Sequence, residues 1–339
     1  MIWRALLLVV GVYCCSTAVI MIKACEVHPV LLASYRQLLA ALALSPLLLR
    51  DLRRHLVRGA AGDARGATAL AAAATGSAPP TAAFRPRMLL RTVLPGAVLG
   101  AHFVTWIIGA RLTPAANSSL IVNMVPIAMP FLAYALLRER LTRGELTGTA
   151  VAIGGLVLLG WADFRLSAVH FQGDLLCFGS MLLFALYLAL GRRNRAFPSL
   201  WLYVVPLYFV GGVVCFVAAL PQVSPLAIPS AWDGLMVLGL ALVPTVMGHS
   251  ILNASMKHLS GQTVSLANLG QFVFAGVMGY AWLDEGLAWS FYPAAALVVL
   301  GAVVALRSAP RPVPARPAGG AVRRTRGATN DTNDSHSAV

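Results

Sequence analysis

Arg36 is a charged residue placed inside a long apolar segment of this 339-residue chain. It follows Pro29 by seven residues, which corresponds to about 10 Å of helical rise. An arginine at such a depth costs roughly 2.5–3.5 kcal/mol on membrane-insertion scales unless it faces a partner or water. Its guanidinium is therefore predicted to bind either a carboxylate or phosphate of a substrate or the backbone carbonyls at a helix end.

Two histidines lie at matching places in the chain, 147 positions apart (249 minus 102). His102 and His249 have three competing interpretations: proton carriers that titrate near neutral pH, hydrogen-bonding residues that line a cavity, or the two axial ligands of a haem. We expect the plain polar lining and no cofactor, because an intramembrane histidine usually faces the interior of the bundle.

Other polar side chains share helix faces with these histidines or with one another. Trp106 and Asn253 each follow a histidine by four residues, so each lies on the same face one turn later. Asn123 lies in the next apolar segment of the first half, and Asn268 and Gln271 share a face in the second. Amides in hydrocarbon either hold helices together or line a cavity, and both roles stay open here.

Acidic residues are absent from the interior of every apolar segment; Glu145 and Asp174 lie at segment edges. A buried carboxylate would be needed to select lipophilic cations or to couple transport to sodium or protons in the usual way, so both functions are disfavoured. The chain has no H-E-x-x-H motif, no Ser/His/Asp set, and five cysteines without a C-x-x-C pair. We therefore predict no catalytic residues and no metal, and the chain is not expected to be an enzyme.

The elements that carry these side chains are predicted to be membrane-spanning helices. The chain is 58% hydrophobic and 11% charged, against roughly 25% charged residues in a soluble domain. Each span needs about 20 apolar residues, and backbone groups in lipid must be satisfied within a helix. The ten expected spans are 4–23, 29–49, 89–110, 114–136, 145–162, 172–191, 200–220, 234–256, 262–283 and 288–307.

Basic residues divide unevenly between the two sides that these spans define. If residue 1 is cytoplasmic, the inner side receives 22 Lys and Arg and the outer side three, namely Lys23, Arg111 and Arg165. This asymmetry predicts that both termini are cytoplasmic in a bacterial-type inner membrane. The formal charge of +14 is thus a topology signal, and no nucleic-acid partner is expected.

The chain also repeats itself. Glu139 and Glu285 are separated by 146 positions (285 minus 139), close to the 147 that separate the histidines. Five spans in each copy would insert the second copy upside down relative to the first. The predicted halves are 1–162 and 172–307, with a flexible cytoplasmic loop at 51–88 and a disordered cytoplasmic tail at 308–339.

These motifs resemble the EamA-like family of the drug/metabolite transporter superfamily, over nearly the whole chain apart from the loop and the tail. The resemblance rests on Gly11, Lys23, Pro29 and Tyr35-Arg36-Gln37, on Pro126, Leu136, Glu139 and Leu141, on Gly154-Gly155, and on Glu285, Leu287 and Gly301. It implies ten helices around a central cavity and transport of small metabolites. It also supports placing Lys23 and Tyr35 in the candidate site, although Lys23 otherwise fits a lysine that snorkels to lipid headgroups.

The sequence thus predicts an all-α polytopic carrier of ten helices that moves a small polar or amphipathic metabolite, amino-acid-like or otherwise carboxylate-bearing, by alternating access. Efflux is the family-level expectation, and the partners are the solute, the lipid bilayer and, in one arrangement, a second copy in a homodimer. The alternatives are a membrane-embedded lipid-modifying enzyme and a channel. The expected substrate-binding residues are Lys23, Tyr35, Arg36, His102, Trp106, Asn123, His249, Asn253, Asn268 and Gln271.

Overall fold

The computed structural model describes residues 2–64, 86–113, 115–138, 142–163, 168–194, 197–226, 229–284, 289 and 291–308. These residues form helices and connecting turns, and no strand occurs among them. In chain order the helices are α1 (Ile2–Lys23), α2 (Pro29–Ala64), η1 (Pro86–Thr92), α4 (Val93–Leu112), α5 (Ala115–Val122), α6 (Val125–Leu137), α7 (Arg143–Asp163), α8 (Ala168–Arg193), α9 (Trp201–Ala219), α10 (Ala231–Leu240), η2 (Ala241–His249), α11 (Ser250–Ser255), α12 (Gly261–Asn268), α13 (Gly270–Leu283) and α14 (Phe291–Ser308).

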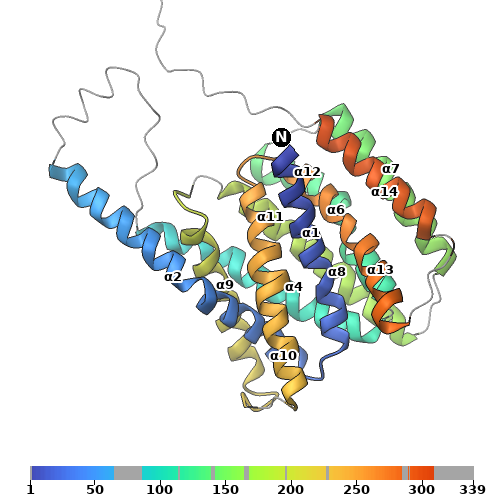
Figure 1. The fold of residues 1–339 in the computed structure, drawn as a ribbon, viewed down its shortest axis with the longest axis horizontal. Helices are drawn as coiled ribbons and strands as arrows, with labels where there is room; N and C mark the ends of the chain where they lie inside the picture. Colours follow the sequence, from blue (N-terminus) through green and yellow to red (C-terminus); the bar gives the residue numbers. More distant parts are fainter. Residues whose placement is uncertain are drawn as a thin grey trace, which may run out of the picture.

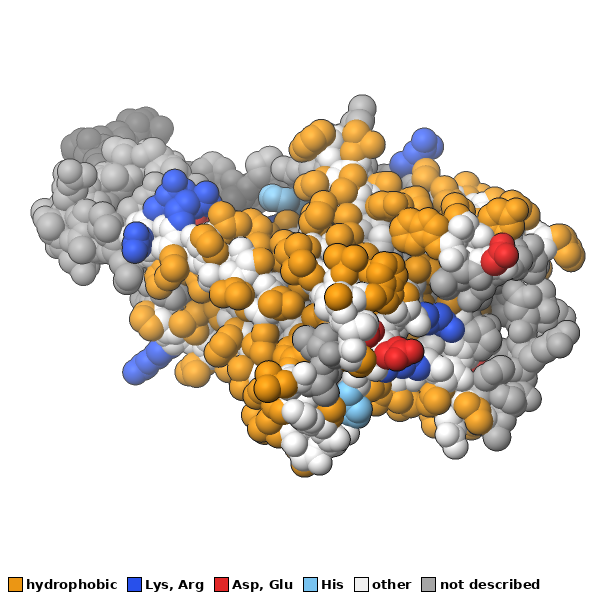
Figure 2. Space-filling view, turned by 60° about the horizontal axis from the view of Figure 1, so that its bottom comes forward, with side chains coloured by type: hydrophobic (Ala, Val, Ile, Leu, Met, Phe, Trp, Pro, Cys, Tyr) orange, Lys and Arg blue, Asp and Glu red, His pale blue; other side chains and the backbone are white. Residues whose placement is uncertain are grey.

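Seven helical stretches in the described ranges are long and apolar enough to cross a membrane, and two shorter apolar stretches cover Ser118–Met129 and Tyr292–Ala305. Large apolar side chains are exposed along them, including Phe209 at 56% and Trp282 at 63%. Figure 2 shows hydrophobic side chains covering most of one face of the molecule, with few charged groups among them. Such a surface is suited to lipid, so the chain is a polytopic membrane protein. The expected count of ten spans stays a prediction.

The helices form a main bundle and a smaller side unit. In the main bundle, α2 packs along α9, α4 packs between α8 and α9, and α1 packs against η2 and α13. The side unit is the pair α7 and α14, which lie side by side at one edge of the molecule (Figure 1). A small apolar core that includes Ala152, Phe272 and Val298 joins this pair to α12 and α13.

Helix α2 is longer than the sequence pattern indicates. The loop predicted at 51–88 begins as a continuation of α2 through Ala64 and ends in the short helix η1, while residues 65–85 lie outside the described part. The continuation is rich in alanine, leucine and arginine, which are strong helix formers. Residues 51–64 are helical where the pattern indicated a loop, because low hydrophobicity ends a span without ending a helix. The flexible cytoplasmic character of 51–88 stays a prediction. The tail predicted at 308–339 lies outside the described residues apart from Ser308.

The two halves share local irregularities. The span predicted at 114–136 is divided into α5 and α6 at Asn123 and Met124, and the span predicted at 262–283 is divided into α12 and α13 at Leu269. Each then ends at a residue in the left-handed conformation, Arg138 with φ 56° and Asp284 with φ 55°. These two residues are 146 positions apart (284 minus 138), the spacing found in the sequence. The two halves therefore share these local features, while the arrangement as two inverted five-helix repeats stays a prediction.

A π-helical segment, η2, interrupts the long helix formed by α10 and α11. Pro244 lies inside it and has no N–H to donate, so the carbonyl of Leu240 loses its usual α-helical partner. The hydroxyl of Thr245 donates to that carbonyl at 2.7 Å instead. Single-turn π segments occur frequently at functional sites, and this one faces the cavity described next.

Candidate functional site

A narrow cavity lies within the main bundle and receives side chains from both halves of the chain. It is lined by Cys15, Ala18, Arg36, His102, Trp106, Val122, Asn123, Phe184, Pro244, His249 and Gln271. Its volume is about 20 Å³, measured as the space open to the centre of a water molecule, which is room for one or two waters. A solute of metabolite size can enter only after the helices move apart.

Arg36 is fully buried at the wall of this cavity. Its Nε and Nη2 donate to the hydroxyl of Thr245 at 3.1 and 3.0 Å, and its guanidinium carbon lies 3.8 Å from the ring centroid of Phe103. Nη1 has no hydrogen-bond partner among the described residues. Among the described residues one ion pair occurs, between Arg50 and Asp51, so no carboxylate there neutralises Arg36. A buried cation with an unused donor is equipped to bind an anion.

The hydroxyl of Thr245 is fully used by this arrangement. It has one proton, which goes to the carbonyl of Leu240, and two lone pairs, which accept the two N–H groups of Arg36. The backbone carbonyl of Thr245 accepts a further hydrogen bond from the Tyr208 hydroxyl at 3.2 Å. Arg36 of the first half is thereby attached to the π-helical segment of the second half.

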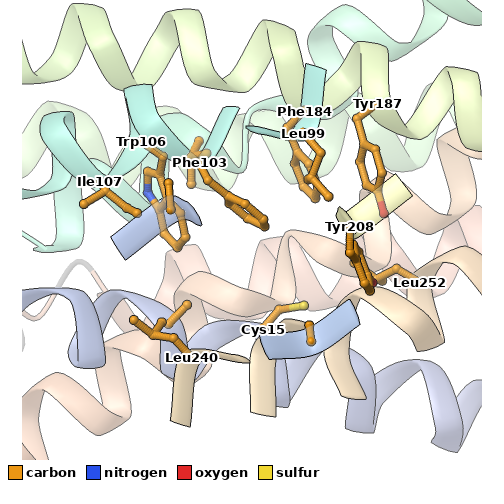
Figure 3. Close-up of a cluster of buried hydrophobic side chains, with 14 of the residues drawn as sticks. Cys15, Leu99, Phe103, Trp106, Ile107, Phe184, Tyr187, Tyr208, Leu240 and Leu252 are labelled. Carbon is orange, nitrogen blue, oxygen red and sulfur yellow. The ribbon is translucent and has the colours of Figure 1, made fainter. Parts of the chain in front are cut away.

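Aromatic rings form one wall of the cavity. In Figure 3, Trp106 and Phe103 of α4 and Phe184 and Tyr187 of α8 form a row that faces Cys15 of α1 across the site. Phe184 is nearly parallel to Tyr187, with ring centroids 5.9 Å apart. The sequence pattern did not indicate the lining residues Phe184 and Cys15, nor Phe103 beside Arg36, because apolar residues that face the interior look like those that face lipid.

His102 is held at one ring nitrogen. Its Nδ1 lies 3.0 Å from the carbonyl oxygen of Ser180 and 2.7 Å from the Ser180 hydroxyl, which itself donates to the carbonyl of His102 at 3.0 Å. A carbonyl only accepts, so this network assigns the Nδ1 proton and leaves Nε2 as the acceptor in the neutral ring. The ring also stacks on Phe184 at 4.7 Å and on Trp106 at 6.0 Å.

His249 lies edge-on to the same aromatic wall. Its ring centroid is 5.2 Å from that of Phe103 and 5.8 Å from that of Phe184. Phe103 therefore contacts both His249 and Arg36. His249 is 5% exposed, and its Nδ1 has no hydrogen-bond partner among the described residues. A buried nitrogen of this kind is available for a hydrogen bond with a solute.

The predicted amides differ in their placement. Asn123 and Gln271 line the cavity, and Asn268 lies between them, donating to the Asn123 amide oxygen at 3.5 Å and accepting from Gln271. This chain of amides joins the break between α5 and α6 to the helices α12 and α13. Asn253 lies outside the lining and donates to the Tyr187 hydroxyl and to the carbonyl of His249.

Trp106, Tyr35 and Lys23 occupy different surroundings. Trp106 lines the cavity, and its indole N–H donates to the Ser118 hydroxyl at 3.1 Å. Tyr35 is partly exposed and packs against the edge of the main core. Lys23 ends α1, is partly exposed, and is not among the lining residues. The cavity is thus lined by Arg36, both histidines, Trp106, Asn123 and Gln271, whereas Lys23 and Tyr35 lie apart from it.

The loop between α1 and α2 closes one end of the bundle. Arg111 donates to the carbonyls of Cys25 and Val27 at 2.6 and 2.8 Å, and Asp233 accepts from the backbone N–H of Glu26 at 2.7 Å. Burial raises the pKa of the Cys25 thiol, which keeps it protonated at neutral pH. Arg111 therefore has a structural role, which the sequence pattern did not indicate.

Glu145 forms a polar contact between the two halves, at the place where α7 and α12 begin. Its carboxylate accepts from the N–H of Thr142 at 3.0 Å, while the Thr142 hydroxyl accepts from the N–H of Glu145 at 3.1 Å, which is a reciprocal capping box at the start of α7. The other carboxylate oxygen accepts from the hydroxyls of Ser260 and Thr263. The T-x-x-E spacing could have identified this cap from the sequence.

The fold and the site define a class: a polytopic helical membrane protein with a closed polar cavity between two related halves. The family model described as "EamA-like transporter family" matches the chain twice, over residues 2–161 and 171–307. The protein therefore belongs to the EamA-like transporter family, within the drug/metabolite transporter superfamily. Members of this family are transporters and not enzymes.

Among solved structures, a chain named only "Crystal structure of protein" is similar over 89% of this chain and 98% of its own length, with a TM-score of 0.66 and 18% sequence identity. At that identity the likeness concerns the fold alone. None of the curated proteins matches this sequence.

Proposed function

We propose that this transporter carries a small carboxylate-bearing metabolite, amino-acid-like in size and polarity, and exports it from the cytoplasm. The observation that supports this most directly is Arg36, a fully buried cation with an unpartnered Nη1 and no carboxylate beside it in the described part of the chain. A solute carboxylate would supply the missing negative charge and accept from Nη1. The histidine nitrogens and the amides Asn123 and Gln271 would contact the rest of the solute.

Alternating access is the mechanism that fits a cavity of this kind. The cavity is too small for a metabolite as it stands, and its lining comes from both halves, so a rocking motion of one half against the other would open it. The pairing of helices supports an inverted arrangement, because α1 packs against the η2 region of the second half while α8 packs against α4 of the first. We further propose ten spans with both termini in the cytoplasm, at the cell inner membrane.

Two rival functions make different predictions. A channel would conduct without saturation, whereas a carrier shows saturable flux and counter-exchange. A lipid-modifying enzyme would leave a covalently changed lipid. Purified protein in proteoliposomes, loaded with one unlabelled metabolite and exposed to the same labelled metabolite outside, separates these functions. Accumulation of label driven by the internal pool supports the carrier, and its absence for every carboxylate tested would contradict the proposal.

The substrate itself is best found in cells. We expect that deletion of this transporter raises the intracellular pool of its carboxylate-bearing substrate and lowers the external pool. The Arg36→Ala variant should reproduce the deletion, while the wild-type protein restores both pools. A change confined to cationic metabolites would overturn the assignment of substrate class.

A further inference from the structure

A second and larger cavity opens at the end of the bundle where α4 begins and α8 ends. Its volume is about 330 Å³, measured in the same way as the central cavity, and it is lined by Leu90, Arg91, Leu94, Pro95, Leu190, Arg193 and Asn194. The two helices run antiparallel here, since Gly109 near the end of α4 contacts Gly173 near the start of α8. This groove is separate from the site of the proposed solute.

The groove carries positive charge without a counter-charge. Arg91 and Arg193 are both exposed, and neither forms an ion pair in the described part of the chain. Asn194, which also lines the groove, donates to the backbone carbonyl of Arg91 at 3.5 Å. No acidic side chain lines the groove. Two guanidinium groups in one concave site are suited to binding a phosphate, because each guanidinium can donate two hydrogen bonds to it.

The groove lies at the level where two spans end. One membrane-crossing stretch begins at Pro86 and another ends at Arg193, so the arginines lie at the boundary between the apolar zone and the headgroups. Toward the membrane interior the groove is lined by Leu94, which is 59% exposed, and by Leu190. The wall of the groove is therefore basic at the membrane surface and apolar toward the membrane interior, which is the polarity of a phospholipid.

We infer that this groove binds an anionic phospholipid, with the headgroup phosphate between Arg91 and Arg193 and the acyl chains along Leu94 and Leu190. Basic pockets between transmembrane helices recognise anionic headgroups in this way. The groove is separate from the solute cavity. A bound lipid would hold the start of α4 against the end of α8. His102 and Ser180 lie farther along these same two helices.

Native mass spectrometry of the full-length protein tests this inference. The protein is titrated with phosphatidylglycerol and, separately, with phosphatidylcholine, and bound lipid is counted. We expect tighter binding of phosphatidylglycerol, weakened about 30-fold in the double variant Arg91→Gln/Arg193→Gln. The matched control is Arg87→Gln/Arg143→Gln, which removes the same charge from exposed positions outside the groove and should bind lipid as the wild type does.

Three results would overturn the inference. Equal weakening of lipid binding in both double variants would indicate a general effect of surface charge, and equal binding of the two lipids by the wild type would show that the headgroup is not recognised. Binding of inorganic phosphate as tight as that of phosphatidylglycerol would indicate a site for a soluble anion. If the double variant does not remain folded, Arg193→Gln alone gives the same test, with an expected loss of about fivefold.

Discussion

Arg36 and Thr245 join the two halves of this transporter at the cavity, through two hydrogen bonds of 3.1 and 3.0 Å from the guanidinium to one hydroxyl. The residues are 209 positions apart in the chain. Because Thr245 lies in the π-helical segment, these hydrogen bonds attach Arg36 of the first half to that segment of the second half. A solute carboxylate bound at Nη1 would thus contact a group that is connected to both halves.

Thr245→Val should destabilise the protein. Valine has nearly the same shape but cannot accept from Arg36 or donate to the Leu240 carbonyl, which leaves buried polar groups unpaired at a cost of about 1–3 kcal/mol each. We expect a lower midpoint of thermal unfolding in detergent, measured without solute. Thr245→Ser keeps the hydroxyl and should stay close to the wild type; a valine variant as stable as the serine variant would show that these hydrogen bonds contribute little.

Arg36→Ala should abolish transport while the protein still inserts into the membrane. Loss of a buried charge that contacts the solute is expected to reduce solute binding by at least about 30-fold. Arg36→Lys keeps the charge and loses the planar donor geometry, so it should transport poorly. Arg53→Ala removes an exposed arginine of the same helix and serves as the control. Flux in Arg36→Ala equal to that of the control would remove Arg36 from the site.

The double variant His102→Gln/His249→Gln should flatten the pH dependence of transport. Free imidazole changes its protonation between pH 5 and 8, and no other side chain does so at its ordinary pKa. Glutamine retains hydrogen bonding without titration. The measurement is the rate of uptake into proteoliposomes across this pH range, with tracer flux at each pH compared with that of the wild type. An unchanged profile in the double variant would mean that protons follow another route.

Glu145→Ala should weaken the junction of α7 and α12. The substitution removes half of the capping box, worth roughly 1 kcal/mol, and the charge-assisted hydrogen bonds to Ser260 and Thr263, worth about 1.5–3 kcal/mol each. We expect a clearly lower unfolding midpoint by thermal denaturation. Thr147→Ala alters an exposed hydroxyl in the same helix, which bonds only to the carbonyl of Arg143, and should have no measurable effect.

Gly301→Leu should separate α14 from α7. A Cβ atom at Gly301 would lie 2.5 Å from the carbonyl oxygen of Gly148, a contact that forces the backbones apart and costs about 1–3 kcal/mol. Gly154→Leu, also in this helix pair, meets no atom within 4 Å and provides the control. Thermal stability of both variants in detergent compares them, and equal stability would show that close backbone approach is unimportant here.

Several residues of the site could be predicted from the sequence, because placing a charged or polar side chain in lipid is energetically unfavourable. An arginine or histidine inside an apolar segment stands out in the sequence, since burial without a partner is unfavourable, and Arg36, His102 and His249 all lie at the cavity. Lys23 and Tyr35 gave a weaker signal, because a residue at the end of a span can reach water or headgroups without entering the interior, and neither lines the cavity.

The membrane location of this protein, the duplication of its halves and its transporter family could all be read from the chain, because composition, spacing and motif order do not depend on which segments pack together. The three-dimensional packing shows that Thr245 is the partner of Arg36, that Ser180 orients His102, that Phe103 lies against Arg36 and that Phe184 lines the cavity. In lipid both faces of a helix are apolar, so the pattern along the chain does not mark the face that turns inward. Packing between distant segments makes that choice.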